Sequence, residues 1–536
     1  MTGKYTGSNK PLKKYSFSSA NHLLNDCPLS GSLPGDRLKN ILLIRADAGP
    51  AIGSGHVMRC LALAEAWKDD GGEVIVLLAA SAQSLEERLS AEATAILHIA
   101  CEPGSREDAG ETVRIAREYR VDRVVIDGYH FGAEYQTQLR DAGLGFLVID
   151  DYGHAAGYYA NLVLNLNMYA DPSLYPVHEP ATRFLLGTRY ALLRREFLAY
   201  TGFRRTIPPV ARKILVTFGG GDPDNLSGVV TEILKDLPVD DLEVVVIAGG
   251  ISPHLDALRS SVRDLPHISI RSNVTDMPRL MAWADMAISA GGSTSWELAF
   301  MGLPSLLYTA AANQARVVDT LVAQGMAERL TNEDLADPSA GLKKISGLLL
   351  SGKRRQVMSR QMHTLVDGEG ASRVTMCLRD EPIRLRAVRE EDSDLVYQWI
   401  NDPDVRVRSF RTHSITPEEH RAWFASVLAD PGILYFIAVD RHDRPVGQAR
   451  FRIESDHAVI SVLLEPTSRN QGLGSRVIGI ATRRLFSMTP VQEVHAFIKT
   501  GNESSFRAFA KAGYARGGMT TVENQEAYLM KRGREI

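Results

Sequence analysis

A histidine near the front of the chain follows a glycine-rich turn, which itself comes after an apolar run. The run covers residues 40–44. Gly53 and Gly55 let the chain turn into a helix that we expect to begin at about His56. The positive end of a helix disfavours an imidazolium, so a neutral ring able to accept a proton from water is expected. We interpret His56 as a candidate general base; a capping or loop histidine without chemistry is the alternative.

A second glycine-rich turn, at residues 291–297, has the composition of a phosphate site. Ser293 and Thr294 stand at the start of an expected helix, where hydroxyls and backbone N–H groups bind phosphate. Glu297 lies one turn into that helix and is placed either to bind ribose hydroxyls or to form a capping box. Asn313 follows the next strand, where it is placed for polar contacts across a cleft or is an ordinary loop amide.

A third glycine-rich turn, R-x-x-G-x-G, lies in the last third of the chain and runs from Arg469 to Gly474. An apolar strand at 458–464 precedes it and an apolar helix at 477–485 follows. Backbone N–H groups in such a turn point at an anion, and the helix dipole adds positive potential, so pyrophosphate is the expected ligand. A tight turn without a ligand is the alternative.

Short apolar runs alternate with helix-length segments through the first two thirds of the chain. This pattern predicts parallel sheets covered by helices on both faces, with ligands outside the carboxyl ends of the strands. The pattern restarts at 213–218, after Pro208 and Pro209, and alternates in the antiparallel manner beyond residue 381. The expected fold class is therefore α/β, with two Rossmann-like lobes followed by an α+β domain. The predicted parts are a polar extension (1–38), a first lobe with the histidine (39–207), a second lobe (208–380) and a last domain (381–536).

Composition excludes several classes of protein. A chain of 536 residues is too long for one core, and 61 basic against 64 acidic residues argue against a general nucleic-acid or anionic-membrane binder. No apolar run approaches the roughly 20 residues needed to cross a bilayer, and no hydrophobic segment follows the N-terminal lysines as in a secretory signal. Four scattered cysteines without a C-x-x-C pair indicate neither zinc nor disulfides, so a cytoplasmic location is expected.

The front two thirds, roughly residues 40–378, resemble a known family at several motifs. This part is similar to the UDP-2,4-diacetamido-2,4,6-trideoxy-β-L-altropyranose hydrolases of pseudaminic acid biosynthesis. The similarity lies in R-x-D with I-G-x-G-H-x-x-R, in V-I-D-D at 148–151 and in the loop at 218–220. S-x-G-G-S/T-x-x-E is similar to the nucleotide site of MurG-type glycosyltransferases. The resemblance implies a GT-B fold, His56 as general base, attack of water on the anomeric carbon with inversion, and no metal. The predicted substrate-binding residues are Arg45, Asp47, Gly53, Gly55, Gly220, Ser293, Thr294, Glu297 and Asn313. Asp47 and Asp150 match family positions without an assigned role.

Residues 381–533 resemble the GNAT acetyltransferases in element order, in the R-x-x-G-x-G turn and in a helix from Asn502 that ends at Gly513 and Tyr514. The resemblance implies acetyl-CoA as cosubstrate, with its pyrophosphate on the turn. The predicted cofactor-binding residues are Leu464, Arg469, Gln471, Gly472, Leu473, Gly474, Ser475 and Asn502. Phe509 stands where many members have a tyrosine general acid, so the proton donor is unassigned, with Tyr514 as a weak candidate. Glu465 is either a helper in amine deprotonation or a solvated carboxylate.

Together these resemblances predict a bifunctional nucleotide-sugar enzyme. The last domain would N-acetylate a UDP-4-amino-sugar with acetyl-CoA, and the front lobes would hydrolyse the product to UDP and free sugar. Two alternatives stay open for the front lobes: a GT-B glycosyltransferase, or a non-catalytic nucleotide-sugar-binding module. The acetyltransferase could also act on another amine, because a fold does not fix a substrate.

Overall fold

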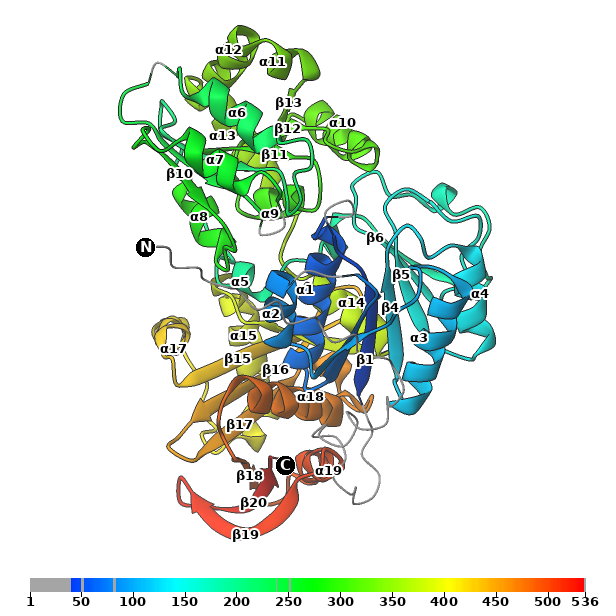
Figure 1. Ribbon diagram of the computed structural model, residues 1–536. Helices are drawn as coiled ribbons and strands as arrows, with labels where there is room; N and C mark the ends of the chain where they lie inside the picture. The colour runs from blue at the N-terminus through cyan, green and yellow to red at the C-terminus, as the bar shows by residue number, and fades with distance from the viewer. Residues whose placement is uncertain (1–39, 50–52, 81–82, 238, 250–251, 535–536) are drawn as a thin grey trace, which may run out of the picture. The chain divides into compact units, whose positions relative to one another are not determined.

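The computed structural model describes residues 40–49, 53–80, 83–237, 239–249 and 252–534 (Figure 1). The predicted N-terminal extension at 1–38, with Cys27, lies outside the described residues. The other cysteines, Cys60, Cys101 and Cys377, are free thiols. Within the described part of the chain, no helix has both the length and the apolar character needed to span a bilayer.

The first lobe is a seven-stranded parallel sheet in the order β3-β2-β1-β4-β5-β6-β7. Its strands are β1 (Ile41–Ala46), β2 (Glu73–Leu78), β3 (Ala95–His98), β4 (Arg123–Asp127), β5 (Phe146–Ile149), β6 (Leu162–Asn165) and β7 (Arg183–Leu186). Its helices are α1 (Gly55–Asp69), α2 (Gln83–Ser90), α3 (Arg106–Glu118) and α4 (Ala133–Asp141). Alternate β1 residues face opposite layers: Leu42 packs in the core with α1, whereas Leu43 packs with α3 and α4 (Figure 1). Both faces of the sheet are therefore buried, as the continuous apolar runs predict.

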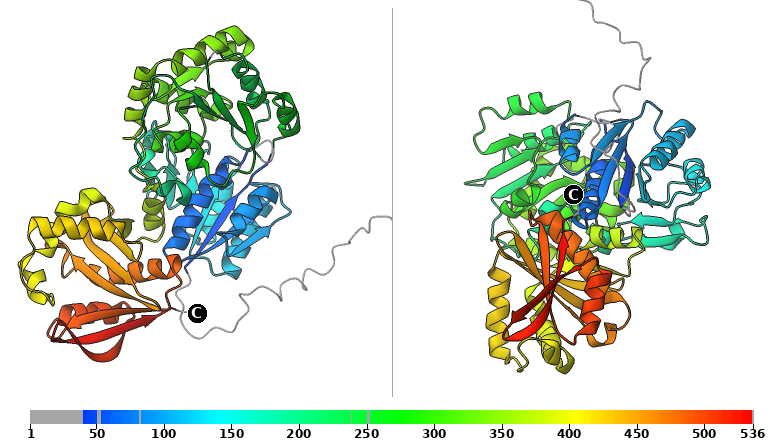
Figure 2. Two further views of the ribbon diagram at one scale, coloured as in Figure 1. Left: turned by 90° about the vertical axis from the view of Figure 1, so that its left-hand side faces the viewer. Right: turned by 90° about the horizontal axis from the view of Figure 1, so that it is seen from below.

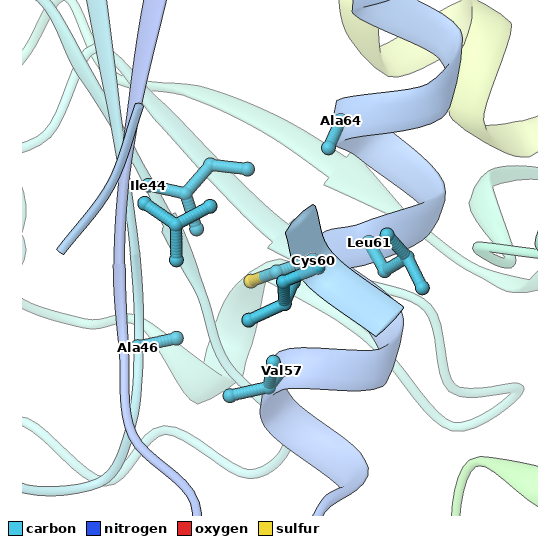
Figure 3. Close-up of a pocket in the computed structure, with 8 residues that line it drawn as sticks. Ile44, Ala46, Val57, Cys60, Leu61 and Ala64 are labelled. Carbon is cyan, nitrogen blue, oxygen red and sulfur yellow. The ribbon is translucent and has the colours of Figure 1, made fainter. Parts of the chain in front are cut away.

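The start of α1 is fixed by close packing on β1 (Figure 3). Val57, Cys60 and Ala64 of the helix and Ile44 and Ala46 of the strand surround a small gap. This gap is lined by hydrophobic residues and has no room for a water molecule. It is therefore part of the core, and it anchors the helix whose first turn carries His56.

The second lobe is a six-stranded parallel sheet in the order β10-β9-β8-β11-β12-β13. Its strands are β8 (Lys213–Thr217), β9 (Glu243–Ile247), β10 (Ile268–Arg271), β11 (Met286–Ala290), β12 (Ser305–Tyr308) and β13 (Glu328–Leu330). Its helices are α6 (Leu226–Leu234), α7 (Leu255–Ser261), α8 (Met277–Trp283), α9 (Thr294–Phe300), α10 (Ala315–Ala323), α11 (Asn332–Ala336), α12 (Pro338–Leu349) and α13 (Gly352–Met362). Helices α6, α7 and α12 share one core with the sheet, and α8, α9 and α10 share the other.

The last domain is a seven-stranded mixed sheet in the order β14-β15-β16-β17-β18-β20-β19. Its strands are β14 (Ile383–Ala387), β15 (Ile433–Asp440), β16 (Pro445–Ile453), β17 (His457–Leu464), β18 (Glu493–Lys499), β19 (Ala515–Val522) and β20 (Gln525–Gly533). Its helices are α15 (Ser393–Ile400), α16 (Pro403–Arg408), α17 (Pro417–Ala429), α18 (Leu473–Met488) and α19 (Glu503–Lys511). Helices α15 and α17 cover one face, and α18 and α19 the other (Figure 2). The predicted fold class, two Rossmann-like lobes followed by an α+β domain, is confirmed.

Helix α14 (Gly370–Leu378) follows the second lobe in sequence but packs against α1 of the first lobe. Its Arg373 also pairs with Asp443, in the turn between β15 and β16, at 2.9 Å. Asp443 is paired in addition with Arg384 of β14, at 2.6 Å, and with Arg189, at 2.9 Å. One carboxylate of the last domain therefore joins three arginines, two of which belong to the front lobes.

Candidate active sites

His56, the second residue of α1, forms a pair with a buried carboxylate at the end of a neighbouring strand. Its Nδ1 lies 2.7 Å from Oδ1 of Asp127, the last residue of β4. The wholly buried carboxylate accepts the Nδ1 proton, which leaves the lone pair on Nε2. Arg59 Nη2 lies farther from the same nitrogen, at 3.2 Å, and donates to Asp127 Oδ1 at 2.7 Å. The pair therefore presents His56 as a proton acceptor through Nε2.

Arg59 connects two carboxylates behind His56. Its guanidinium donates to both oxygens of Asp127, at 2.6 and 2.7 Å, and to both oxygens of Asp151, at 2.9 and 3.0 Å. Burial alone would raise the pKa of Asp127, but the charge of Arg59 and the hydrogen bonds from Arg59 and His56 hold that pKa below its usual range. Asp127 therefore stays ionised, and its negative charge lies directly against the His56 ring.

Tyr129 links this group to the second lobe. Its hydroxyl donates to Asp151 at 2.6 Å and accepts from Asn313 Nδ2 at 2.7 Å. Its ring meets the His56 ring edge-on, with centroids 4.9 Å apart. Burial and the charge of Asp151 raise the pKa of Tyr129, so its hydroxyl keeps its proton. Asn313 thus reaches from one lobe to the residues that surround His56.

The glycine-rich turns of the two lobes also meet beside His56. A Cβ atom on Gly55 would lie 3.7 Å from Ser293 Oγ, and one on Gly220 would lie 2.3 Å from Ser54 Oγ. Gly53 has φ +76°, a conformation that favours glycine. The close approach at Gly220 leaves no space for a side chain.

Arg45 and Asp47, which the sequence predicts to bind substrate, lie in the interior of the first lobe. Both are wholly buried and pair with each other at 2.7 Å. Arg45 also pairs with Asp108 at 2.8 Å, and Asp47 accepts hydrogen bonds from the backbone N–H groups of Ala79 and Ala80. Neither side chain has surface available to a ligand, so both stabilise the end of β1 from within.

Glu297 pairs with Arg194 at 3.0 Å instead of forming a capping box. Ser293 precedes α9 in a helical conformation, and its side chain makes no capping hydrogen bond. Burial raises the pKa of Glu297, and the charge of Arg194 works against this rise. Arg194 therefore fixes the carboxylate on the turn that carries Ser293 and Thr294.

A second candidate site lies where two parallel strands of the last domain separate. Strands β17 and β18 pair only from His457 to Val459 and from Glu493 to His495, although β17 continues to Leu464 and β18 to Lys499. Beyond these pairs, the facing backbone edges are available to an extended ligand. The separation opens toward the turn that ends in Gly474, which lies next to Leu464 and Ala508.

The turn from Arg469 to Gly474 leads directly into α18. Asn470 and Gly472 have φ of +61° and +75°, and no side chain caps the helix, so its first backbone N–H groups remain for a ligand. Arg469 itself pairs with Asp402 at 3.1 Å and Asp404 at 3.3 Å. The turn therefore presents backbone donors, while its arginine is held by α16.

The remaining side chains predicted at this site mainly support local structure. Gln471 Nε2 donates to the carbonyl of Thr467 at 2.8 Å, and Asn502 caps α19 by accepting from Ser505 N. Glu465 accepts hydrogen bonds from Thr467 and Ser468, which hold its pKa below the usual value against the effect of burial. Glu465 therefore caps the short turn that follows β17.

Tyr514 is buried away from the separation of the strands. Its hydroxyl bonds Thr482 Oγ1 at 2.7 Å, and its ring meets Phe509 edge-on at 5.0 Å. Burial raises the pKa of Tyr514. Phe509 and Tyr514 therefore belong to the core between α18 and α19.

We expect Tyr514→Phe to change the rate of acetyl transfer by less than about twofold, because the hydroxyl bonds only core residues. Loss of the buried hydrogen bond should lower the free energy of unfolding by about 0.5–1.5 kcal/mol. Steady-state kinetics and urea denaturation measure the two effects, and Thr482→Val should give a similar loss of stability from the other side of the bond. A hundredfold slower acetyl transfer in Tyr514→Phe would instead make Tyr514 the proton donor.

Comparisons with known proteins agree with this division of the chain. Residues 213–371 match the glycosyltransferase family 28 C-terminal domain, and residues 383–515 match the acetyltransferase (GNAT) domain. The spore coat polysaccharide biosynthesis protein SpsG of Bacillus subtilis is 27% identical over 63% of this chain and 97% of its own length. The uncharacterized protein MJ1062 of Methanocaldococcus jannaschii is 22% identical over 89% of this chain and 96% of its own.

The UDP-2,4-diacetamido-2,4,6-trideoxy-β-L-altropyranose hydrolase of Campylobacter jejuni is 24% identical over 47% of this chain and 85% of its own length. The relationship to MJ1062 extends across both halves of the chain. The chain therefore combines front lobes that are similar to that hydrolase, and that include a glycosyltransferase family 28 C-terminal domain, with a GNAT acetyltransferase domain.

Proposed function

We propose that the front lobes hydrolyse UDP-2,4-diacetamido-2,4,6-trideoxy-β-L-altropyranose to UDP and the free sugar. The observation that carries this proposal is the pair of His56 and Asp127 beside Asn313 and the glycine-rich turns of the second lobe. The pair supplies a base, and the turns supply donors for a diphosphate.

In the proposed reaction, His56 Nε2 accepts a proton from water as the water oxygen attacks the anomeric carbon. The bond between that carbon and the phosphate oxygen breaks, UDP leaves with the bonding electrons, and the configuration inverts. Asp127 stabilises the imidazolium that forms, which then releases its proton to solvent. UDP is a good leaving group, so the second carboxylic acid of an ordinary glycosidase is not needed.

The proposed contacts to UDP and sugar come from the second lobe. Ser293, Thr294 and Gly220 bind phosphate oxygens, Glu297 binds ribose hydroxyls, and Asn313 binds UDP or sugar while it holds Tyr129. The loop with Gly53 and Gly55 allows the close approach of the two lobes. Arg45 and Asp47 are not among the proposed contacts to UDP and sugar, because both are wholly buried.

We propose further that the last domain N-acetylates the UDP-4-amino-sugar precursor with acetyl-CoA. The pyrophosphate binds the backbone of Gly472, Leu473, Gly474 and Ser475, and the pantetheine arm lies between β17 and β18 against Leu464. Arg469, Gln471 and Asn502 stabilise the backbone around this site through their local ion pairs and hydrogen bonds. Fusion keeps the acetylated product at a high effective concentration near the front lobes.

The test is to incubate the full chain with acetyl-CoA and the UDP-4-amino-sugar and to identify the products by mass spectrometry. CoA, UDP and free diacetamido sugar are expected in equal amounts. Release of CoA without UDP would remove the hydrolase from the proposal, and release of UDP without CoA would remove the acetyltransferase. A UDP-sugar without an amine serves as the control that should yield no CoA.

The match to a glycosyltransferase family 28 domain favours one other function, transfer of the sugar to an acceptor. The same assay separates the two, because a hydrolase releases UDP in buffer alone. A glycosyltransferase would release UDP at a comparable rate only when an acceptor is added.

A further inference from the structure

A second pair of a histidine and a carboxylate lies at the carboxyl edge of the first sheet, beside the pair of His56 and Asp127. Asp150 directly follows β5, the strand next to β4, and its buried carboxylate accepts a hydrogen bond from Nδ1 of His154. Burial alone would raise the pKa of Asp150, but hydrogen bonds from His154 and Tyr158 hold that pKa below its usual value. The ionised carboxylate takes the Nδ1 proton, which leaves the lone pair of His154 on Nε2.

The Nε2 atom of His154 is buried and makes no hydrogen bond within the described residues. The side chain of His154 as a whole is only 5% exposed. A buried polar atom without a partner costs about 1–3 kcal/mol, and such atoms are rare in folded proteins. The free lone pair therefore indicates a ligand that donates an N–H or O–H group.

Two tyrosine rings pack around His154, and one of them also contacts His56. The centroid of the Tyr129 ring lies 5.6 Å from that of His154 and 4.9 Å from that of His56. The Tyr152 ring lies 5.2 Å from Tyr129 and 6.2 Å from His154, and Tyr152 is 39% exposed. Tyr129, Tyr152 and His154 therefore form one aromatic group, and a ligand that enters from solvent meets the Tyr152 ring first.

We propose that this aromatic group binds the 4-acetamido group of the sugar, with the amide N–H donating to Nε2 of His154 and the methyl group packed on Tyr129 and Tyr152. The inference rests on the proposed hydrolysis by the front lobes. C4 lies across the pyranose ring from the anomeric carbon, which faces His56 in that reaction. The C4 substituent therefore meets a group farther away, and His154 lies one tyrosine ring from His56.

The aromatic group favours the acetylated sugar over its amine precursor. Without the acetyl group the 4-amino nitrogen is largely an ammonium ion at neutral pH, and burial of an ion costs more free energy than burial of an amide. The oxygens of Asp150 already accept hydrogen bonds from His154, Tyr158 and the backbone of Gly153. The amine also lacks the methyl group that packs on the tyrosines. Acetylation by the last domain therefore precedes the release of UDP.

The test measures UDP release by the full chain, without acetyl-CoA, from the diacetamido sugar nucleotide and from its UDP-4-amino precursor. We expect kcat/KM to be about a hundredfold lower for the precursor. In Tyr152→Ala and His154→Phe this ratio should fall to about ten or less, because only the acetylated substrate loses contacts. Tyr152→Phe should keep most of the ratio. His178→Phe, which replaces a histidine beside Phe184 in the same lobe, should keep all of it.

Equal kcat/KM values for the two sugar nucleotides, or an unchanged ratio in either Tyr152→Ala or His154→Phe, would overturn the inference and leave the hydrolase in place. If neither sugar nucleotide releases UDP, the proposed hydrolysis is wrong. Calorimetric titration with the same two sugar nucleotides then decides the question without turnover. Binding of the diacetamido form that is about tenfold tighter, with this difference lost in Tyr152→Ala, supports the aromatic group; equal binding rejects it.

Discussion

His56→Ala is expected to lower the rate of UDP release by about 10²–10⁴-fold, the usual contribution of a general base. The ring is the proton acceptor that Asp127 orients, and alanine leaves the water without one. UDP should bind with nearly unchanged affinity, because the proposed phosphate contacts come from the second lobe. Acetyl transfer should also be kept. The measurements are UDP release from the diacetamido sugar nucleotide, calorimetric titration with UDP, and release of CoA.

The control is His98→Ala, which removes an exposed histidine at the end of β3 in the same lobe. It should leave all three measurements unchanged. If His56→Ala releases UDP at the unmodified rate, the front lobes do not use this imidazole, and a binding module without catalysis becomes the better hypothesis. Loss of UDP binding together with hydrolysis would also contradict the proposal, because His56 is assigned no role in binding.

Arg59→Met is expected to lower the free energy of unfolding by about 3–5 kcal/mol, since it leaves Asp127 and Asp151 buried without their shared cation. Denaturation in urea measures this loss. Arg114→Met is the matched control: Arg114 also pairs with two carboxylates, but on the exposed surface of α3. That change should cost less than about 1 kcal/mol. Equal losses in the two variants would show that burial of the Arg59 cluster contributes nothing.

The cluster of Arg59 and Asp127 predicts that the free energy of unfolding depends on pH. The folded state holds the pKa of Asp127 below its unfolded value of about 3.9, so this carboxylate contributes stability that is full above pH 4 and is lost as the pH falls through the folded pKa. Without Arg59, burial would raise the folded pKa, and protonation would then favour the folded state. The stability difference between Arg59→Met and the unmodified chain should therefore shrink as the pH is lowered from 7 to 4. A constant difference would contradict this account.

The buried strands could be predicted because their apolar composition identifies them, whereas several edge strands could not, although β14 could be predicted as a strand. β3 and β13 are short and lie at the sheet edges, with several partly exposed residues, so neither gives a continuous apolar run. β19 is mostly polar and exposed. The turn that joins it to β20 places Glu523 and Asn524 at positive φ without the glycine that usually marks such a turn.

The candidate sites show the same limit in their side-chain partners. His56 could be found because glycines mark its turn, but Asp127 stands 71 residues away, and only folding places it against the ring. The feature of the sequence that could have identified Asp127 is its position at the end of an apolar run, at the same sheet edge as His56. Arg45 and Arg469 have the types and spacing of ligand contacts, yet both meet carboxylates from distant segments. Motifs locate a site, whereas side-chain orientation depends on partners remote in sequence.

The position of α14 bears on how the two activities could be separated. Because this helix packs on α1 while its Arg373 pairs with Asp443, a stop codon just after Leu378 would leave Arg373 paired with Asp367 alone. Arg189 would lose its carboxylate partner. The detached acetyltransferase would keep Asp443 with Arg384 alone. Splitting the gene at this junction would therefore yield two polypeptides with mutually attractive cut surfaces, which would tend to reassociate after separate expression.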